Sequence, residues 1–309
     1  GSLNLVVNLT DRGPVQPFVS FGVSACDMEI AGAYDTAYAY TYYSGEHQFL
    51  DFDYPVIDPK PGEPNHESWL GEEWRDVTGA NVWSTMALDE DNGIVYAPTG
   101  DGNSGAAGSH LFSSSVVALD AATGALRWFR QLTHRDIWDW DAPTPPLLTD
   151  LEIDGQTVPA VIVTGKHSLF FMFNRLTGEP LWEITEQPVP PSQVPGERSA
   201  LTQPKPIAPP QLLNPFLMPS DAWGLTPWDR GDCARHLGEL QNLGLFTPTS
   251  EKLTLMFPGS LGGPNWGGGA LLGDSGVLLV NVNNVAFTGQ LIPTPDDTDP
   301  DSRKQDHPA

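Results

Sequence analysis

Short apolar runs alternate with polar turns along much of the chain. The run 94–97 (IVYA) precedes a glycine-rich loop, and the run 116–119 (VVAL) precedes a turn at Thr123-Gly124. Apolar runs of four to eight residues bounded by such turns are typical of β-strands. The pattern therefore predicts an all-β protein.

Two segments repeat one strand-turn-strand unit. Residues 116–128 (VVALDAATGALRW) and 170–182 (FFMFNRLTGEPLW) align without a gap, and their closing tryptophans, Trp128 and Trp182, are 54 residues apart. A third, degraded copy is 38–49 (YAYTYYSGEHQF). A four-stranded unit that recurs at about fifty residues is typical of one β-propeller blade. The repeat also predicts that each closing aromatic residue packs on the neighbouring unit.

A glycine-rich loop imitates a dinucleotide-binding motif. Residues 100–105 read G-x-G-x-x-G, and Asp120 stands about twenty residues later, as the motif requires. However, only seven residues, 106–112, connect the loop to the next strand, which starts near Ser113. This stretch is too short for the crossover helix between parallel strands. The sequence therefore predicts a plain loop here and places Asp120 in a strand-turn unit, Ala118-Leu119-Asp120, rather than at a ribose.

The patterns divide a single partial propeller into consecutive regions. Residues 183–219 contain ten prolines, which suits either an interdomain linker or an ordered insertion on one propeller face. Because β-like sequence resumes at 245–257, the insertion is favoured, with a short helix expected at 237–244. The predicted regions are a divergent blade region (1–58), blades (59–182), a proline-rich insertion (183–244), further blade strands (245–292) and a charged tail (293–309).

Charge and cysteine content narrow the function classes. The 309 residues include 15 Lys and Arg against 39 Asp and Glu, for a net charge of −24. Such a chain repels phosphate backbones, so a nucleic-acid partner is not expected. Cys26 and Cys233 belong to no C-x-x-C motif, which argues against a zinc knuckle or haem attachment. A disulfide between them stays open. Both termini are expected to be cuts through a longer polypeptide.

The segment 133–148 (THRDIWDWDAPTPPLL) concentrates the candidate chemistry. Asp136, Asp139 and Asp141 alternate there with Trp138 and Trp140. Carboxylates beside aromatic rings in a loop suit a sugar or a hard cation, although a polar turn with packing tryptophans fits the local pattern as well.

Two further stretches add candidates. Lys166 follows a strand and a turn at Thr164-Gly165, a position where a lone lysine is usually just solvated. Asn265 and Trp266 are flanked by glycines, which let a backbone approach a flat ligand closely.

Five segments together resemble the pyrroloquinoline-quinone (PQQ)-dependent dehydrogenases, in particular the membrane-associated glucose/quinate/shikimate type. They are 61–69, 79–100, 111–151, 188–204 and 245–268, whereas residues 1–58 match poorly. The resemblance implies an eight-bladed β-propeller with PQQ in the axial channel above Ca²⁺ or Mg²⁺. This chain would supply about four blades, and the remaining blades and any membrane anchor are expected to be missing from it.

The resemblance also implies roles for individual residues. Asp139 corresponds to the catalytic carboxylate, and Lys166, 27 residues later, to the basic residue that contacts the quinone oxygens. Trp83 corresponds to the aromatic residue that stacks on PQQ. Asp101 stands where many relatives have a metal-ligating asparagine, and the family's other carboxylate ligand is expected near Asp27. Asp101, Asp139 and Asp27 are thus the predicted metal ligands, and Asn265 and Trp266 are predicted to contact PQQ.

The expected reaction is the oxidation of a sugar or cyclic polyol. A carboxylate takes the hydroxyl proton while hydride passes to PQQ, and a lysine and a divalent cation stabilise the developing oxyanion. The resemblance implies a periplasmic enzyme that passes its electrons to membrane quinone. The alternatives are a propeller that serves as a non-catalytic scaffold and an inactive fragment of such an enzyme.

Overall fold

The computed structural model describes residues 2–8, 62, 65–70, 80–101, 107–108, 110–195, 197–273 and 276–292. The degraded repeat at 38–49, the proposed ligand Asp27 and the charged tail at 293–309 lie outside the described residues. No helix in the described ranges is long and apolar enough to cross a membrane.

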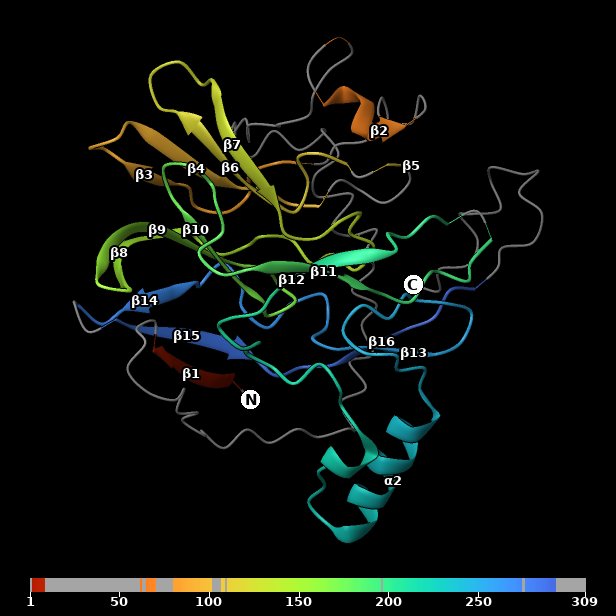
Figure 1. Ribbon diagram of the computed structural model, residues 1–309. Helices are drawn as coiled ribbons and strands as arrows, with labels where there is room; N and C mark the ends of the chain where they lie inside the picture. The colour runs from red at the N-terminus through yellow and green to blue at the C-terminus, as the bar shows by residue number, and fades with distance from the viewer. Residues whose placement is uncertain are drawn as a thin grey trace, which may run out of the picture.

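The first sheet is a four-stranded antiparallel meander (Figure 1). It consists of β3 (Ala87–Asp89), β4 (Ile94–Pro98), β6 (Ser115–Asp120) and β7 (Leu126–Gln131), paired in chain order. Because β4 and β6 are antiparallel, the connection between them is not the crossover of a dinucleotide-binding unit. The structure therefore excludes the crossover, as predicted, although the connection also contains the short strand β5 (Ala107–Gly108), and residues 102–106 of the loop lie outside the described ranges.

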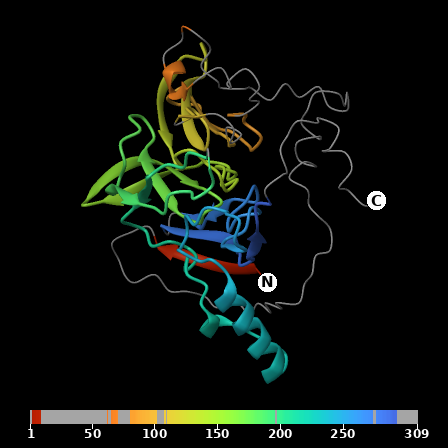
Figure 2. The same cartoon turned by 90° about the vertical axis from the view of Figure 1, so that its right-hand side faces the viewer.

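Two three-stranded sheets follow. β8 (Leu147–Ile153), β9 (Gln156–Thr164) and β10 (Phe170–Asn174) form one of them. The other pairs the N-terminal β1 (Ser2–Asn8) with β15 (Val277–Asn283), whose second neighbour is β14 (Gly269–Leu271). Figures 1 and 2 both show the three sheets in succession, with β8–β10 in the middle.

Three two-stranded sheets complete the strands of the described part. They are β2 (Trp69–Leu70) with β5 (Ala107–Gly108), β11 (Ile184–Pro188) with β12 (Thr202–Pro206), and β13 (Thr254–Met256) with β16 (Phe287–Gly289).

The C-terminal half of β9 and most of β10 are buried on both faces of the middle sheet. On β9, Val161 and Val163 pack in a cluster with Tyr96 and Val116 of the first sheet. Ile162, between them in sequence, packs on the other side with Leu278 of β15. Successive strand residues point to opposite faces, so a strand covered on both sides is apolar throughout. This explains the unbroken apolar runs of β9 and β10.

The two repeat copies form the same turn. Gly124 and Gly178 each have φ of 72°, and each amide donates a 2.8 Å hydrogen bond to the carbonyl four residues earlier. Trp128 packs on the turn of the next copy, where its Nε1 donates to the carbonyl of Arg175 at 3.0 Å. The predicted packing on the neighbouring unit is therefore confirmed for Trp128, and the closing aromatic residue of the third copy, Phe49, lies outside the described residues. In the second copy the outer strand is reduced to one bridge, at Pro180, because proline has no N–H for a ladder.

The proline-rich segment carries β11, β12, a 3-10 helix (Pro219–Asp221) and the helix α2 (Pro227–Glu239). The helix expected at 237–244 was therefore placed too late. Thr226 caps α2: its side chain accepts from the Asp229 N–H, and the Asp229 carboxylate accepts from the Thr226 N–H. Of its residues only Cys233 is buried, so α2 has no apolar stripe to reveal it. In Figures 1 and 2 it extends away from the sheets.

Candidate functional site

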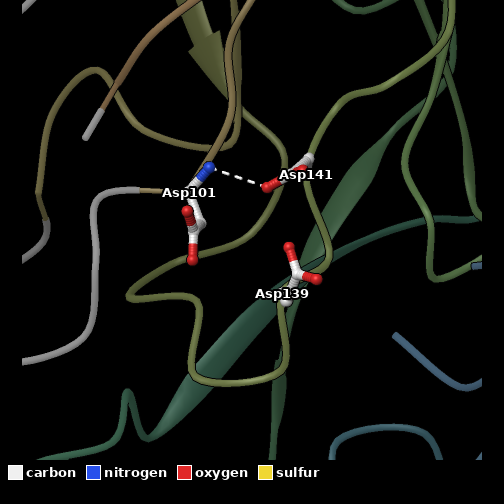
Figure 3. Close-up of side chains that lie close together, drawn as sticks. All are labelled: Asp101, Asp139 and Asp141. Atoms are coloured by element: carbon white, nitrogen blue, oxygen red, sulfur yellow. Dashed lines mark hydrogen bonds between the residues drawn. The ribbon is translucent and has the colours of Figure 1, made fainter. Parts of the chain in front are cut away.

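Four connecting segments bring the candidate residues together. Trp83 lies before β3, Asp101 follows β4, Asp139 lies in the loop between β7 and β8, and Lys166 lies in the turn between β9 and β10. Figure 3 shows the carboxylates of Asp101, Asp139 and Asp141 facing one another. We call these three carboxylates with Lys166 and Trp83 the acidic site.

A buried carboxylate shapes the loop that carries Asp139. Asp136 accepts hydrogen bonds from the amides of Trp138 (3.0 Å) and Trp140 (2.7 Å) and from the Ser114 hydroxyl (3.0 Å). The two indoles stack in the core with ring centroids 5.4 Å apart. Asp139 adopts φ of 60°, and about half of its side chain is exposed. Burial, followed by repulsion from Asp141, raises the pKa of Asp136 to about 6.

Lys166 is the cation of the acidic site. Its buried ammonium lies 2.8 Å from Asp139 Oδ1 and 3.0 Å from Asp141 Oδ2, and 5.6 Å from the centre of the Trp83 ring. Its amide donates to the Asp141 carbonyl, and its carbonyl accepts from the Gly263 amide. Burial alone lowers the pKa of Lys166, but the Asp141 and Asp139 carboxylates outweigh burial and raise it.

Asp141 connects the segments of the site. Its Oδ2 accepts from Trp83 Nε1 at 3.1 Å as well as pairing with Lys166, and its Oδ1 accepts from the Asp101 amide at 2.7 Å. No individual role is predicted for Asp141 from the sequence, beyond its place among the three candidate carboxylates of this segment. A signal was present, because Asp141 alternates with Trp138 and Trp140 in the segment that concentrates the candidate chemistry.

The three carboxylates could hold a cation. One oxygen each from Asp101, Asp139 and Asp141 lies within 4.8 Å of the others. Three carboxylates and one ammonium leave a formal charge of −2, and hard divalent cations prefer oxygen ligands. Burial first, then repulsion among the acids, raises the pKa of Asp101 well above its ordinary value and that of Asp139 to about 7.

Two glycines permit the close packing of the site. A Cβ on Gly100 would lie 2.8 Å from Asn81 Oδ1 and 3.0 Å from the Trp83 ring. Gly262, with φ of 75°, faces Lys166, where an added Cβ would lie 2.6 Å from the lysine Cβ. The segment 259–268 therefore borders the acidic site through its main chain.

The two other predicted PQQ contacts within the described residues, Asn265 and Trp266, are not among the residues of the acidic site. Trp266 is 72% exposed, and Asn265 hydrogen-bonds within its own loop, to the carbonyl of Leu261 and the amide of Trp266. The structure thus groups four of the predicted residues, namely Trp83, Asp101, Asp139 and Lys166. The contacts predicted between PQQ and Asn265 or Trp266 stay predictions.

Comparison with known proteins decides the family. The model of the β-propeller domain of PQQ-dependent glucose/ethanol/alcohol dehydrogenases matches residues 26–309. The chain belongs to this family. The expected partial β-propeller is confirmed, and the first sheet is one four-stranded blade of this quinoprotein fold.

Its relatives include quinone-linked dehydrogenases. The quinate/shikimate dehydrogenase (quinone) of Acinetobacter baylyi is 37% identical over 250 residues, which are 78% of this chain and 31% of the relative. Quinoprotein glucose dehydrogenase A of Acinetobacter calcoaceticus is 37% identical over 254 residues, 77% of this chain and 31% of the relative. This quinoprotein chain thus spans about a third of the length of these relatives.

A solved structure supports the fold. The quinohemoprotein alcohol dehydrogenase ADHIIG of Pseudomonas putida HK5 superposes with a TM-score of 0.52 at 22% sequence identity. The match covers 80% of this quinoprotein chain and 33% of that structure.

Proposed function

We propose that this chain forms the catalytic part of a quinoprotein dehydrogenase that oxidises a sugar or cyclic polyol, with Asp139 as the general base. The observation that carries the proposal is the position of the Lys166 ammonium, between the Asp139 and Asp141 carboxylates and beside the Trp83 indole. A buried cation, an exposed carboxylate and an aromatic ring in one place suit the oxidation of an alcohol at a flat redox cofactor.

The residues present fit PQQ and a divalent cation. The oxygens of Asp101, Asp139 and Asp141 suit Ca²⁺ or Mg²⁺, and the remaining charge of −2 matches either ion. Trp83 would hold the flat ring system by stacking, and Lys166 would face its anionic oxygens. When bound, PQQ supplies the two-electron acceptor that no protein side chain provides.

Asp139 is suited to accept the proton of the substrate hydroxyl. About half of its side chain is exposed, so a substrate can reach it, while the loss of water on the side that faces the protein, together with repulsion from Asp141, raises its pKa to about 7. A base whose pKa lies near the working pH combines the correct protonation state with useful basicity. Lys166 holds Asp139 Oδ1, so Oδ2 is the oxygen that we assign to the proton transfer.

Lys166 is suited to stabilise developing negative charge, and Trp83 is suited to orient the flat cofactor. The ammonium is buried and fixed by two carboxylates, so its charge is in place before any reaction begins. Preorganised charge of this kind stabilises negative charge that develops in the transition state. The Trp83 indole is fixed by Asp141 and by contact with Gly100.

The names of the relatives support the substrate class and the electron acceptor. They include quinate/shikimate, glucose and glycerol dehydrogenases, and two of the names specify quinone. We therefore propose a sugar or polyol substrate, membrane quinone as the acceptor and a periplasmic, membrane-associated site of action for the whole protein.

Dye reduction tests this proposal. The complete polypeptide, loaded with PQQ and Ca²⁺, would be assayed with glucose, quinate, shikimate and glycerol, with Mg²⁺ in a parallel series. The expected result is substrate-dependent turnover that requires both PQQ and the cation. A folded protein that binds PQQ yet turns over none of a broad panel of polyols would instead identify a non-catalytic scaffold or an inactive relative.

A further inference from the structure

A buried glutamine of the proline-rich segment forms two hydrogen bonds to the main chain of the loop that carries Asp139. We infer that Gln203, on β12, is a positioning residue for the segment 133–141. Its side chain is fully buried, Oε1 accepts from the His134 amide at 2.8 Å, and Nε2 donates to the His134 carbonyl at 2.7 Å. A primary amide that engages both main-chain groups of one residue fixes the position and the orientation of that residue.

The same hairpin also holds the His134 side chain. Nε2 of His134 lies 3.0 Å from Glu186 Oε1 on β11, and Nδ1 lies 2.8 Å from Gln131 Oε1 on β7. The Glu186 carboxylate interacts with the Thr202 side chain as well. The β11–β12 hairpin and the end of β7 therefore fix both the main chain and the ring of His134.

The segment that follows His134 needs such support. Arg135 has φ of 42° and Asp139 has φ of 60°, in the left-handed region that L-residues with side chains seldom adopt. Conformations of this kind persist when the surroundings impose them. Gln203 imposes the conformation at the start of the segment, Asp136 in the middle through two amides, and Lys166 at Asp139.

The blades and the proline-rich segment therefore hold different parts of the loop that carries Asp139. β7 and β8 supply the ends of the loop, but the partner of its His134 main chain comes from 69 residues further along the chain. Gln203 belongs to the segment Thr202-Gln203-Pro204, which the proposed chemistry does not use. The positioning inference concerns the loop alone, whereas its effect on catalysis rests on the proposed function.

Hydrogen exchange of the purified protein, without added cofactor, tests the inference. Gln203→Met keeps the length and burial of the side chain and removes both hydrogen bonds. For the loss of two such bonds, amides in 133–141 are expected to exchange about tenfold or more faster, while those of β9 stay unchanged. The matched control is Gln187→Ala: Gln187 pairs with Gln203 across the hairpin, but it is exposed and its side chain donates to the Thr185 hydroxyl of its own strand.

A conservative variant distinguishes the loss of the two Gln203 hydrogen bonds from a general loss of structure. Gln203→Glu retains the acceptor for the His134 amide, and its buried carboxyl, which burial keeps protonated, offers an O–H donor to the His134 carbonyl, so an exchange rate between those of wild type and Gln203→Met is expected. Exchange in 133–141 that equals wild type in both variants, or that rises equally in every segment, overturns the inference.

Kinetics then link the loop to catalysis. In the complete, loaded polypeptide, Gln203→Met is expected to lower kcat about tenfold or more with a smaller change in KM, because a displaced base slows chemistry more than binding, and Gln203→Glu is expected to recover part of the loss. An unchanged kcat overturns the catalytic consequence. If wild type itself has no activity, the proposed function fails and the exchange result still decides the positioning role.

Discussion

The ammonium of Lys166 lies 2.8 Å from the carboxylate of Asp139, across 27 residues of sequence and from a different sheet connection. Asp139 is about half exposed, whereas Lys166 is buried, so the pair presents its carboxylate outward and its cation inward. This asymmetry separates two tasks: the accessible group can exchange a proton with a substrate, and the buried group can stabilise charge without being solvated.

Replacing the exposed member of the pair tests its role as a base. In the complete, loaded polypeptide, Asp139→Asn is expected to lower kcat by about 10²–10⁴-fold, the usual contribution of a general base. The melting temperature should change little, because desolvation and repulsion from Asp141 offset the attraction between Asp139 and Lys166. Dye-reduction kinetics and thermal melting check the two expectations. Turnover within tenfold of wild type would remove Asp139 from the mechanism.

Replacing the buried member should instead affect folding. Lys166→Met leaves the buried Asp141 carboxylate without its cation, and such uncompensated buried charge costs about 3–5 kcal/mol. Adding Asp141→Asn should recover part of that loss, since the stranded charge is removed. Urea unfolding at pH 7 of the two single variants and the double variant measures this coupling. Strictly additive losses would contradict a direct Lys166–Asp141 interaction.

The sequence predicted the strands and four members of the site because their signals are local or shared with a family. The Thr-Gly turns of the two repeats and the run of β9 are periodic features, and Trp83, Asp101, Asp139 and Lys166 stand in the segments that resemble relatives. The roles of Asp141 and Gln203 were missed for another reason. The local pattern marks Asp141 as a candidate carboxylate, but Asp141 holds Trp83 across 58 residues and Gln203 holds His134 across 69, and no local pattern encodes such pairings. The helix α2 was misplaced because a capping box, rather than an apolar stripe, marks its start.

The buried Asp136 predicts a pH dependence of stability. Its pKa is about 6 in the folded protein, above the ordinary value of about 3.9 for an unfolded chain. A raised folded pKa contributes stability that is complete below the unfolded pKa and is lost as the pH rises through the folded pKa. Without added cation, the free energy of unfolding is therefore expected to fall by about 2–3 kcal/mol from this group between pH 4 and pH 7.

Urea unfolding across this pH range measures the effect, and Asp136→Asn is the control. The variant cannot titrate at that position, so its stability should depend less on pH between 4 and 7. An identical pH profile for wild type and variant would assign the dependence to other groups, such as Asp101, whose pKa is also raised by burial.

The contact between repeat units can be tested with two equivalent glycines. Gly124 and Gly178 occupy the same turn position and share φ of 72°, so an alanine at either site carries the same conformational cost, about 1–2 kcal/mol. Their surroundings differ: a Cβ at Gly124 would meet nothing within 4 Å, whereas one at Gly178 would lie 2.6 Å from the Trp128 indole. Trp128 is buried and its Nε1 is bonded to Arg175, so it has little freedom to retreat. Gly178→Ala is therefore expected to lower the free energy of unfolding by about 1–3 kcal/mol more than Gly124→Ala does, which is the usual cost of overpacking. Urea unfolding of the two variants measures this difference. Equal losses at the two sites would mean that the tryptophan of one unit yields to the turn of the next, and that the stacking of neighbouring units does not depend on this contact.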